Sequence, residues 1–187
     1  MLNSLQTRSD GFLFVEVGII MQFLETRRFL LRLPEARDFS VYRAFYGDGE
    51  ASRFYGGPLR ADQAWRVLAG HLGHWQLRGY GVWAIAPKGG ADIIGGCGFV
   101  WPEGWPRREL TWWLMPAARG TGAAVEVSQA AIRHAYECFG WSKVETHMND
   151  ENLAARGLVR KLGGEPIARE HFPDGLERTV YGFPGPP

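Results

Sequence analysis

A short turn rich in glycine, Gly120-Thr121-Gly122, has the composition of an anion-binding site. Two glycines in three residues permit positive φ angles and let the backbone approach a ligand closely. The apolar spacing from Ala123 to Phe139 predicts a helix after the turn, and the N–H groups at a helix start favour an anion. Arg119 adds a permanent cation that suits phosphate oxygens. The turn is therefore predicted to bind a pyrophosphate, with an ordinary strand-to-helix turn as the alternative.

The residues before the turn alternate like a half-buried strand from Glu109 to Met115. One face carries Leu110, Trp112 and Leu114, and the other carries Glu109, Thr111, Trp113 and Met115. A strand thus leads through the glycine turn into a helix. This arrangement would hold a carboxylate, Glu109, at a defined distance along the chain from the anion site.

Arg119, Gly122 and Ala124 stand at i, i+3 and i+5, and this spacing resembles the Arg/Gln-x-x-Gly-x-Gly/Ala signature of the GNAT superfamily of acyl-CoA-dependent N-acyltransferases. Three further segments resemble the subgroup that contains the ribosomal-protein N-terminal (alanine) acetyltransferases. They are an opening strand, the strand before the signature and a downstream Asn-helix-Lys-Leu-Gly segment, at Leu24–Arg32, Glu109–Pro116 and Asn152–Gly164. These similarities occur in order along the chain, ending near Phe183.

The resemblance implies that acetyl-CoA is the co-substrate and indicates which residues would hold it. Its pyrophosphate would contact the Arg119 side chain and the backbone amides of Gly120, Thr121, Gly122, Ala123 and Ala124. Leu114 and Met115 would pair with the pantetheine arm through their main-chain groups. Asn152 would contact the same arm, and its alternative role as a helix N-cap is compatible with that contact.

Acyl transfer to an amine requires a base, because an ammonium group is not a nucleophile; the pKa is ~10.4 for a lysine amine and ~7.7 for an α-amine. Glu109 is the first candidate, since the resembling subgroup has a glutamate at this place. Glu103 and His147 are weaker candidates. The alternative interpretation of Glu109 is a surface acid at the end of a strand.

The departing thiolate also needs a proton, and here the sequence differs from the family. Many GNAT enzymes use a tyrosine in the helix that follows the second strand, but Val159 occupies that place, and Ala155 stands where the subgroup often has serine. A thiolate with a pKa near ~8.5 still leaves tolerably unaided. Cys97 is not expected to act as a nucleophile, because no histidine lies near it and a small thiol in a glycine-rich strand packs well.

Sequence periodicity predicts the elements that position these residues. Helices are predicted at 35–46, 61–77, 123–139 and 152–162, and strands at 26–33, 82–86, 93–100, 109–115, 143–148, 167–172 and 178–183. Glycines at 95, 96 and 98 predict a bulge or a close backbone approach, favoured beside a ligand. Phe54-Tyr55, between two helices, could line an acceptor site or only pack as a connector.

This order of elements is α+β and resembles the GNAT fold. The resemblance implies a mixed, mostly antiparallel central sheet flanked by helices. It also implies that the sheet is splayed between the strands on either side of the glycine turn and its helix, with the pantetheine arm in the opening.

Length and composition describe one ordinary globular domain. The 21 basic and 20 acidic residues leave a net charge of +1, which gives no electrostatic reason to expect nucleic acid or an anionic membrane as a partner. The two cysteines lack metal or disulfide-scaffold spacing, so reduced thiols in a cytoplasmic protein are expected. His71 and His74 are interpreted as surface histidines and no metal site is expected.

The apolar run Phe12–Phe23 is too short for a spanning helix and contains Glu16. Because the family-like part begins near Leu24, residues 1–20 are predicted to be a dispensable appendage, and 21–187 a single acyltransferase domain.

Three functions remain to be compared. An acyl-CoA-dependent N-acyltransferase is favoured, acting by direct attack in a ternary complex on a small-molecule or peptide amine, such as a protein N-terminus, a polyamine, an antibiotic or a metabolite; a homodimer is left open. A non-catalytic acyl-CoA-binding or regulatory module on the same fold is the alternative. A nicotinamide-dependent dehydrogenase is less favoured, because Val125 stands at its third glycine position.

Overall fold

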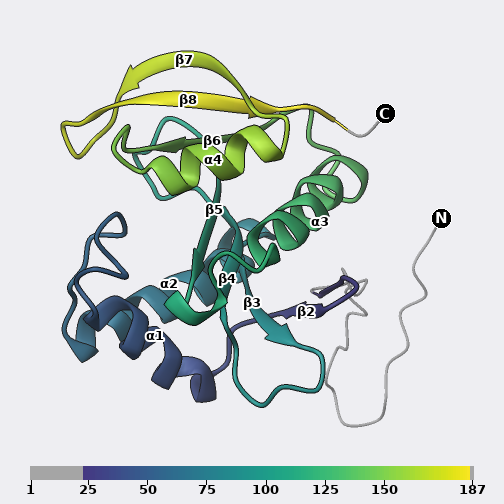
Figure 1. Cartoon of the computed structure of the whole chain (residues 1–187). Helices are drawn as coiled ribbons and strands as arrows, with labels where there is room; N and C mark the ends of the chain where they lie inside the picture. Colours follow the sequence, from purple (N-terminus) through teal and green to yellow (C-terminus); the bar gives the residue numbers. More distant parts are fainter. Residues whose placement is uncertain (1–22, 186–187) are drawn as a thin grey trace, which may run out of the picture.

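Residues 23–185, the part of the chain that the computed structural model describes, form two antiparallel sheets and four α-helices (Figure 1). The strands are β1 (Leu24–Glu25), β2 (Phe29–Arg32), β3 (Val82–Pro87), β4 (Gly95–Val100), β5 (Glu109–Leu114), β6 (Val144–Met148), β7 (Glu165–His171) and β8 (Glu177–Phe183). The helices are α1 (Phe39–Gly47), α2 (Ala61–Arg78), α3 (Ala123–Glu137) and α4 (Leu153–Lys161), with 3-10 turns at Ala36–Asp38 and Pro116–Ala118. The predicted α+β order of elements is confirmed.

The first sheet has five strands in the order β1-β2-β3-β4-β5, and each neighbouring pair is antiparallel. β4 and β5 pair in regular register, with Gly95 opposite Leu114 and Val100 opposite Glu109. The predicted three-strand meander is therefore present. β5 is the last strand of this sheet, so one of its edges is open to the rest of the molecule.

Helices cover both faces of the first sheet, and the alternation of β5 divides its side chains between them. Trp113 packs among Tyr42 and Phe45 of α1, with ring centroids 4.7 Å apart in both pairs. On the other face, Leu110 and Leu114 belong to the cluster that contains Val127 of α3. The two faces that the sequence alternation of β5 predicts therefore pack into two different hydrophobic clusters.

The glycines of β4 are explained by the sheet itself. A Cβ atom at Gly95 or Gly98 would collide with the backbone of the adjacent strand, at the Trp113 and Gly81 carbonyls respectively. A Cβ atom at Gly96 would collide with the indole of Trp113. The predicted close approach is therefore confirmed, and it is to neighbouring strands and a core tryptophan; a ligand beside these glycines stays a prediction.

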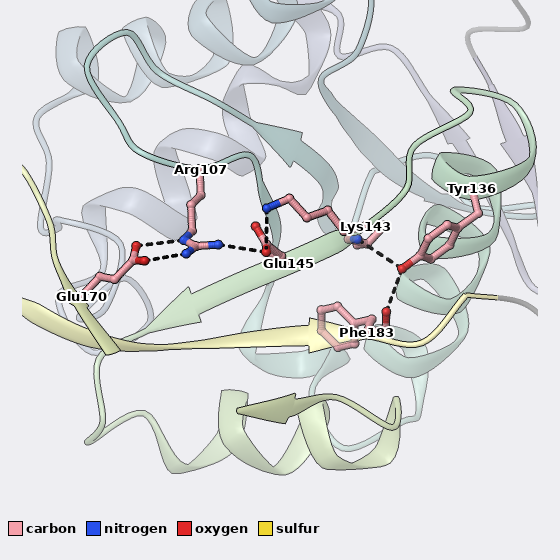
Figure 2. Close-up of polar contacts among 7 residues, drawn as sticks. Arg107, Tyr136, Lys143, Glu145, Glu170 and Phe183 are labelled. Atoms are coloured by element: carbon pink, nitrogen blue, oxygen red, sulfur yellow. Dashed lines mark hydrogen bonds and ion pairs between the residues drawn. The ribbon is translucent and has the colours of Figure 1, made fainter. Parts of the chain in front are cut away.

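The second sheet, in the order β6-β8-β7, is separate from the first, because no ladder joins β5 to β6. The two strands touch where the buried Thr146 hydroxyl donates to the Leu110 carbonyl, at 2.8 Å. Figure 2 shows a second tie, in which Arg107 donates to Glu145 of β6 at 2.9 Å and to Glu170 of β7 at 2.5 Å. The expected splay between the strands that flank α3 is confirmed.

α3 is joined to the second sheet by one tyrosine. The Tyr136 hydroxyl donates to the Phe183 carbonyl at 2.7 Å and accepts from the Val144 amide at 3.2 Å (Figure 2). Through these bonds the helix that follows the glycine turn is held against β6 and β8. The helix that follows β5 is therefore hydrogen-bonded to the sheet on the other side of the opening.

Two local predictions were wrong. Strand β6 is buried along its whole length, not on one face, because Arg107 and Lys143 neutralise its Glu145. The interpretation of His71 as a surface histidine was also wrong, because its Nδ1 lies 3.0 Å from the Tyr42 hydroxyl. His74 is half-buried, and its Nε2 accepts from the Trp101 amide at 3.0 Å. Both imidazoles connect α2 to its neighbours.

The N-terminal prediction lies outside the described residues. Whether residues 1–20 are dispensable to a domain at 21–187 concerns the segment 1–22, for which the structure gives no description. Among residues 23–185, no helix combines the length and apolar character needed to cross a membrane.

Candidate functional site

The glycine turn has the backbone conformation that its sequence predicts. Gly120 and Gly122 have φ angles of 76° and 79°, in the left-handed region that glycine alone enters at little cost. Gly122 is the N-cap of α3, and no side chain caps that helix start. Among the described residues, no acceptor is recorded for the N–H groups of residues 120–124. The helix start is therefore open to an external anion.

A second arginine, Arg28 of the β1–β2 turn, lies at this helix start. Its Nε donates to Glu126 at 2.6 Å and its Nη1 to the Thr121 carbonyl at 3.0 Å. A Cβ atom on Gly122 would lie 3.6 Å from its Nη2. Sequence analysis missed Arg28, because it is 93 residues from Thr121 and no local pattern connects the two.

Arg119 supports the turn from the other side. Its Nε donates to the Leu114 carbonyl at 3.2 Å and its Nη2 donates to the Ala51 carbonyl at 2.9 Å. The guanidinium thus connects the end of β5 to the loop between α1 and α2. Its remaining donors leave a contact with phosphate possible, so that role stays a prediction.

The open edge of β5 presents carbonyl groups that are held by side chains. Carbonyls of alternate strand residues point the same way, and those of Leu110, Trp112 and Leu114 accept from Thr146, Tyr55 and Arg119, respectively. The Met115 amide instead donates to the Ile94 carbonyl at 2.9 Å, and the Met115 carbonyl accepts from Ala118. Main-chain pairing of Leu114 and Met115 with pantetheine stays a prediction.

A cavity of about 570 Å³ occupies the opening between β5 and β6. Its lining includes Glu109, His147 and Asn152, together with Phe54 and Tyr55 from the loop between α1 and α2. The structure therefore brings together two of the predicted site residues, Glu109 and Asn152, although they are far apart in the sequence. The glycine turn and Leu114, Met115 and Arg119 do not line this cavity.

Glu109 and His147 form the titratable centre of the cavity. The His147 Nε2 lies 3.2 Å from the Glu109 Oε2, within ion-pair distance, although the alignment is not that of a hydrogen bond. The Glu109 side chain is 20% exposed and that of His147 is 6% exposed. The imidazole is packed against Phe172, with centroids 4.0 Å apart, and is stacked on Trp105.

Burial shifts both groups toward their neutral forms. It raises the pKa of Glu109 from 4.5 to about 8, against the opposing charge of Arg178. It lowers the pKa of His147 to about 4, with Arg178 acting in the same direction. Between these values the pair is uncharged, with the titratable proton on Glu109. Its carboxylate form, a minor fraction near neutral pH and the major one above about pH 8, can take up a proton from an amine.

Asn152 has the predicted capping role. It is the N-cap of α4, and its Oδ1 accepts from the Ala155 amide at 3.1 Å. The side-chain amide group is a separate donor, so a contact with the CoA arm is compatible with the cap, as expected from the sequence.

The structure also shows why the other residues considered for catalysis are less suitable than Glu109. Glu103 is 99% exposed and pairs with Arg78 at the surface, away from the cavity. Cys97 is fully buried and burial raises the pKa of its thiol to about 12, so it is not a nucleophile. Val159 is fully buried in the core and Ala155 lines the cavity, and neither carries a proton to donate.

Comparison with known proteins identifies the family. The model of a family described as the acetyltransferase (GNAT) domain matches residues 28–165. The chain belongs to this family. It is an N-acetyltransferase, and its family uses acetyl-CoA as co-substrate and amines as acceptors.

Individual relatives agree with this assignment. An uncharacterized N-acetyltransferase of Bacillus subtilis is 24% identical over 154 residues, covering 80% of this chain and 87% of the relative. An acetyltransferase structure from Agrobacterium tumefaciens is 27% identical, with a TM-score of 0.78 over 87% of this chain and 94% of that one. A ribosomal L7/L12 alpha-N-protein acetyltransferase, solved with coenzyme A, shares the fold at 15% identity, with a TM-score of 0.70 over 86% and 96% of the two chains.

Proposed function

We propose that this chain transfers an acetyl group from acetyl-CoA to the primary amine of a small molecule or peptide, by direct attack in a ternary complex. The observation that carries the proposal is the position of Glu109. Its carboxyl group lies in the cavity at the point where β5 and β6 separate, beside His147, and its pKa is about 8. Glu109 is the proposed general base.

The pKa of Glu109 favours one class of acceptor. An α-amine has a pKa of ~7.7, close to that of Glu109, whereas a lysine amine has a pKa of ~10.4. Proton transfer from an α-ammonium group to Glu109 would be nearly balanced, and transfer from a lysine would be uphill by about two pKa units. This match favours an α-amine acceptor, as on an amino acid or a peptide N-terminus, over a lysine side chain.

The glycine turn is the proposed site for the pyrophosphate of acetyl-CoA. Three observations support it: the unpaired backbone amides at the start of α3, the left-handed φ angles of Gly120 and Gly122, and the arginines Arg28 and Arg119 on either side. From there the pantetheine arm would follow the open edge of β5 towards Glu109, passing the amide group of Asn152.

Calorimetric titration with acetyl-CoA, with NADH and ATP as controls, tests the donor site. A panel of amines, assayed by release of the free thiol, then tests turnover. The proposal expects selective binding of acetyl-CoA and higher activity on peptides or amino acids than on N-α-blocked lysine. Selective binding without turnover on any amine would indicate the non-catalytic acyl-CoA-binding module, and preference for NADH would contradict the donor site itself.

A further inference from the structure

Arg53 brings a guanidinium group to the cavity that contains Glu109. It belongs to the loop between α1 and α2, and both Arg53 and the adjacent Phe54 line the cavity. The guanidinium carbon lies 4.9 Å from the centre of the Phe54 ring, which is a cation–π contact. The Arg53 side chain is 55% exposed, so a molecule that enters the cavity from solvent can reach its charge.

The partner of Arg53 is a surface carboxylate outside the cavity. The Arg53 Nη2 donates to the Glu151 Oε2 at 3.2 Å, the one hydrogen bond that this guanidinium makes within residues 23–185. Glu151 is 72% exposed and does not line the cavity. An exposed ion pair with one contact contributes little to stability, and a guanidinium has five N–H donors. Arg53 can therefore exchange Glu151 for another carboxylate at little cost.

The other charged groups of the cavity leave Arg53 as its uncompensated cation. Arg178 donates from Nη1 and Nη2 to the two carboxylate oxygens of Asp174, so its fork is already occupied. Glu109 and His147 are both mostly uncharged at neutral pH, because burial disfavours their ions. Among the described residues that line the cavity, Arg53 is thus the cation without a counter-charge inside it.

We propose that the acceptor carries a carboxylate in addition to its α-amine, and that Arg53 binds this carboxylate in place of Glu151. The inference rests on the proposed acyl transfer and specifies the charge of its acceptor. Excess positive charge in a cavity favours an anionic group and opposes a second cation, and a guanidinium can hold a carboxylate through two parallel hydrogen bonds. The acceptor is a peptide whose carboxylate comes from an acidic side chain or from a free C-terminus, and polyamines are excluded by their charge.

Matched peptides test this preference, because they share an N-terminal alanine and differ in charge at one place. One arm compares glutamate, glutamine and lysine at the second, third or fourth position of a C-terminally amidated tetrapeptide of alanine. The other arm compares trialanine with its C-terminal amide, so the two arms distinguish the sources of the carboxylate. We expect kcat/KM, measured by release of free thiol from acetyl-CoA, to favour the acidic member of a pair by about fivefold to tenfold.

Charge reversal at Arg53 separates electrostatic recognition from a structural role. Arg53→Glu should invert the order, so that the lysine peptide becomes the better acceptor, whereas Arg53→Lys should keep a weaker preference for the acidic one. Glu151→Gln removes the competing carboxylate and should raise kcat/KM for the glutamate peptide. The matched control is Arg66→Glu, because Arg66 is an exposed arginine of α2 outside the cavity, and this variant should keep the wild-type order.

The possible results distinguish this inference from the proposed function. Turnover that does not depend on peptide charge in either arm, or an unchanged order in Arg53→Glu, would overturn the role of Arg53 and leave the acyl transfer intact. Absence of turnover by the wild type on every amine would instead contradict the proposed function. Calorimetric titration with the same peptides in the presence of CoA measures the preference without turnover, and equal affinities for the glutamate and glutamine peptides would overturn the inference in that case too.

Discussion

Replacing Glu109 by glutamine keeps the size of the side chain and removes the proton-accepting carboxylate. Loss of a positioned general base typically costs a factor of about 10² to 10⁴ in rate, and we expect a fall of this size in kcat for Glu109→Gln. Acetyl-CoA affinity should be unchanged, because Glu109 lies where β5 begins, and the glycine turn follows the other end of the strand.

The pKa of Glu109 adds a quantitative expectation for pH. With a pKa of about 8, the carboxylate fraction is about 9% at pH 7 and about 91% at pH 9. The acceptor amine titrates identically for both enzymes, so the ratio of wild-type to variant kcat/KM isolates Glu109. This ratio should rise about tenfold between pH 7 and pH 9.

Protein stability should respond to pH with a defined sign. A carboxyl group whose pKa is raised on folding stabilises the protein fully below its unfolded value of 4.5 and loses that contribution as pH rises through about 8. The shift of about 3.5 pKa units corresponds to at most about 5 kcal/mol. Glu109→Gln should therefore gain stability relative to the wild type as pH increases over this range.

The assay measures thiol release at fixed saturating acetyl-CoA while the acceptor and the pH are varied, with denaturant unfolding at the same pH values. Glu103→Gln is the matched control, since Glu103 is fully exposed and outside the cavity. Wild-type turnover by Glu109→Gln, or a rate ratio that does not change with pH, would refute the assignment of Glu109 as the base.

Three further predictions concern the donor site and the support of the opening. Gly122→Glu places a negative side chain at a left-handed position of the glycine turn, and it should abolish acetyl-CoA binding in calorimetry. The control is Gly175→Glu, at a left-handed position in the β7–β8 turn, and this variant should bind acetyl-CoA as the wild type does. Asn152→Asp keeps the capping oxygen but loses the amide donor, so melting temperature should be retained while acetyl-CoA affinity falls; unchanged affinity would leave Asn152 only its cap. Arg107→Met leaves the buried Glu145 with Lys143 as its remaining cation and should lower the free energy of unfolding by about 2 kcal/mol. The exposed Arg169→Met should have a much smaller effect. Equal effects of the two substitutions in chemical denaturation would contradict the stabilising role of the Arg107–Glu145 pair.

Several features of the fold were predictable from short stretches of sequence. The alternation of β5, the left-handed turn at Gly120 and Gly122, and the Asn152 cap each depend on residues within one strand or one turn. Local sterics and local hydrogen bonds are enough to specify such features. The order of these elements then indicated the α+β fold, which the family match confirms.

Predictions that depended on neighbours far along the chain were less successful. β6 was expected to be half-buried, but Arg107 makes burial of its Glu145 possible. The sequence predicted a close backbone approach at the β4 glycines but did not indicate that the adjacent strands and Trp113 make it. His71 was interpreted as exposed, but it meets Tyr42 from another helix. In each case the deciding contact comes from an element that no local period reveals.

The sequence by itself determined the elements, their order, the left-handed conformation of the glycine turn and the choice of Glu109 as candidate base. Only the tertiary structure decided the electrostatic state of that base, because burial beside His147 raises its pKa to about 8. It also decided that Arg28, 98 residues from Glu126, supports the turn, and that Tyr55, 57 residues from Trp112, lies over the open strand edge. A proton affinity is set by solvent exclusion and by nearby charges, and these exist only once distant segments have packed together.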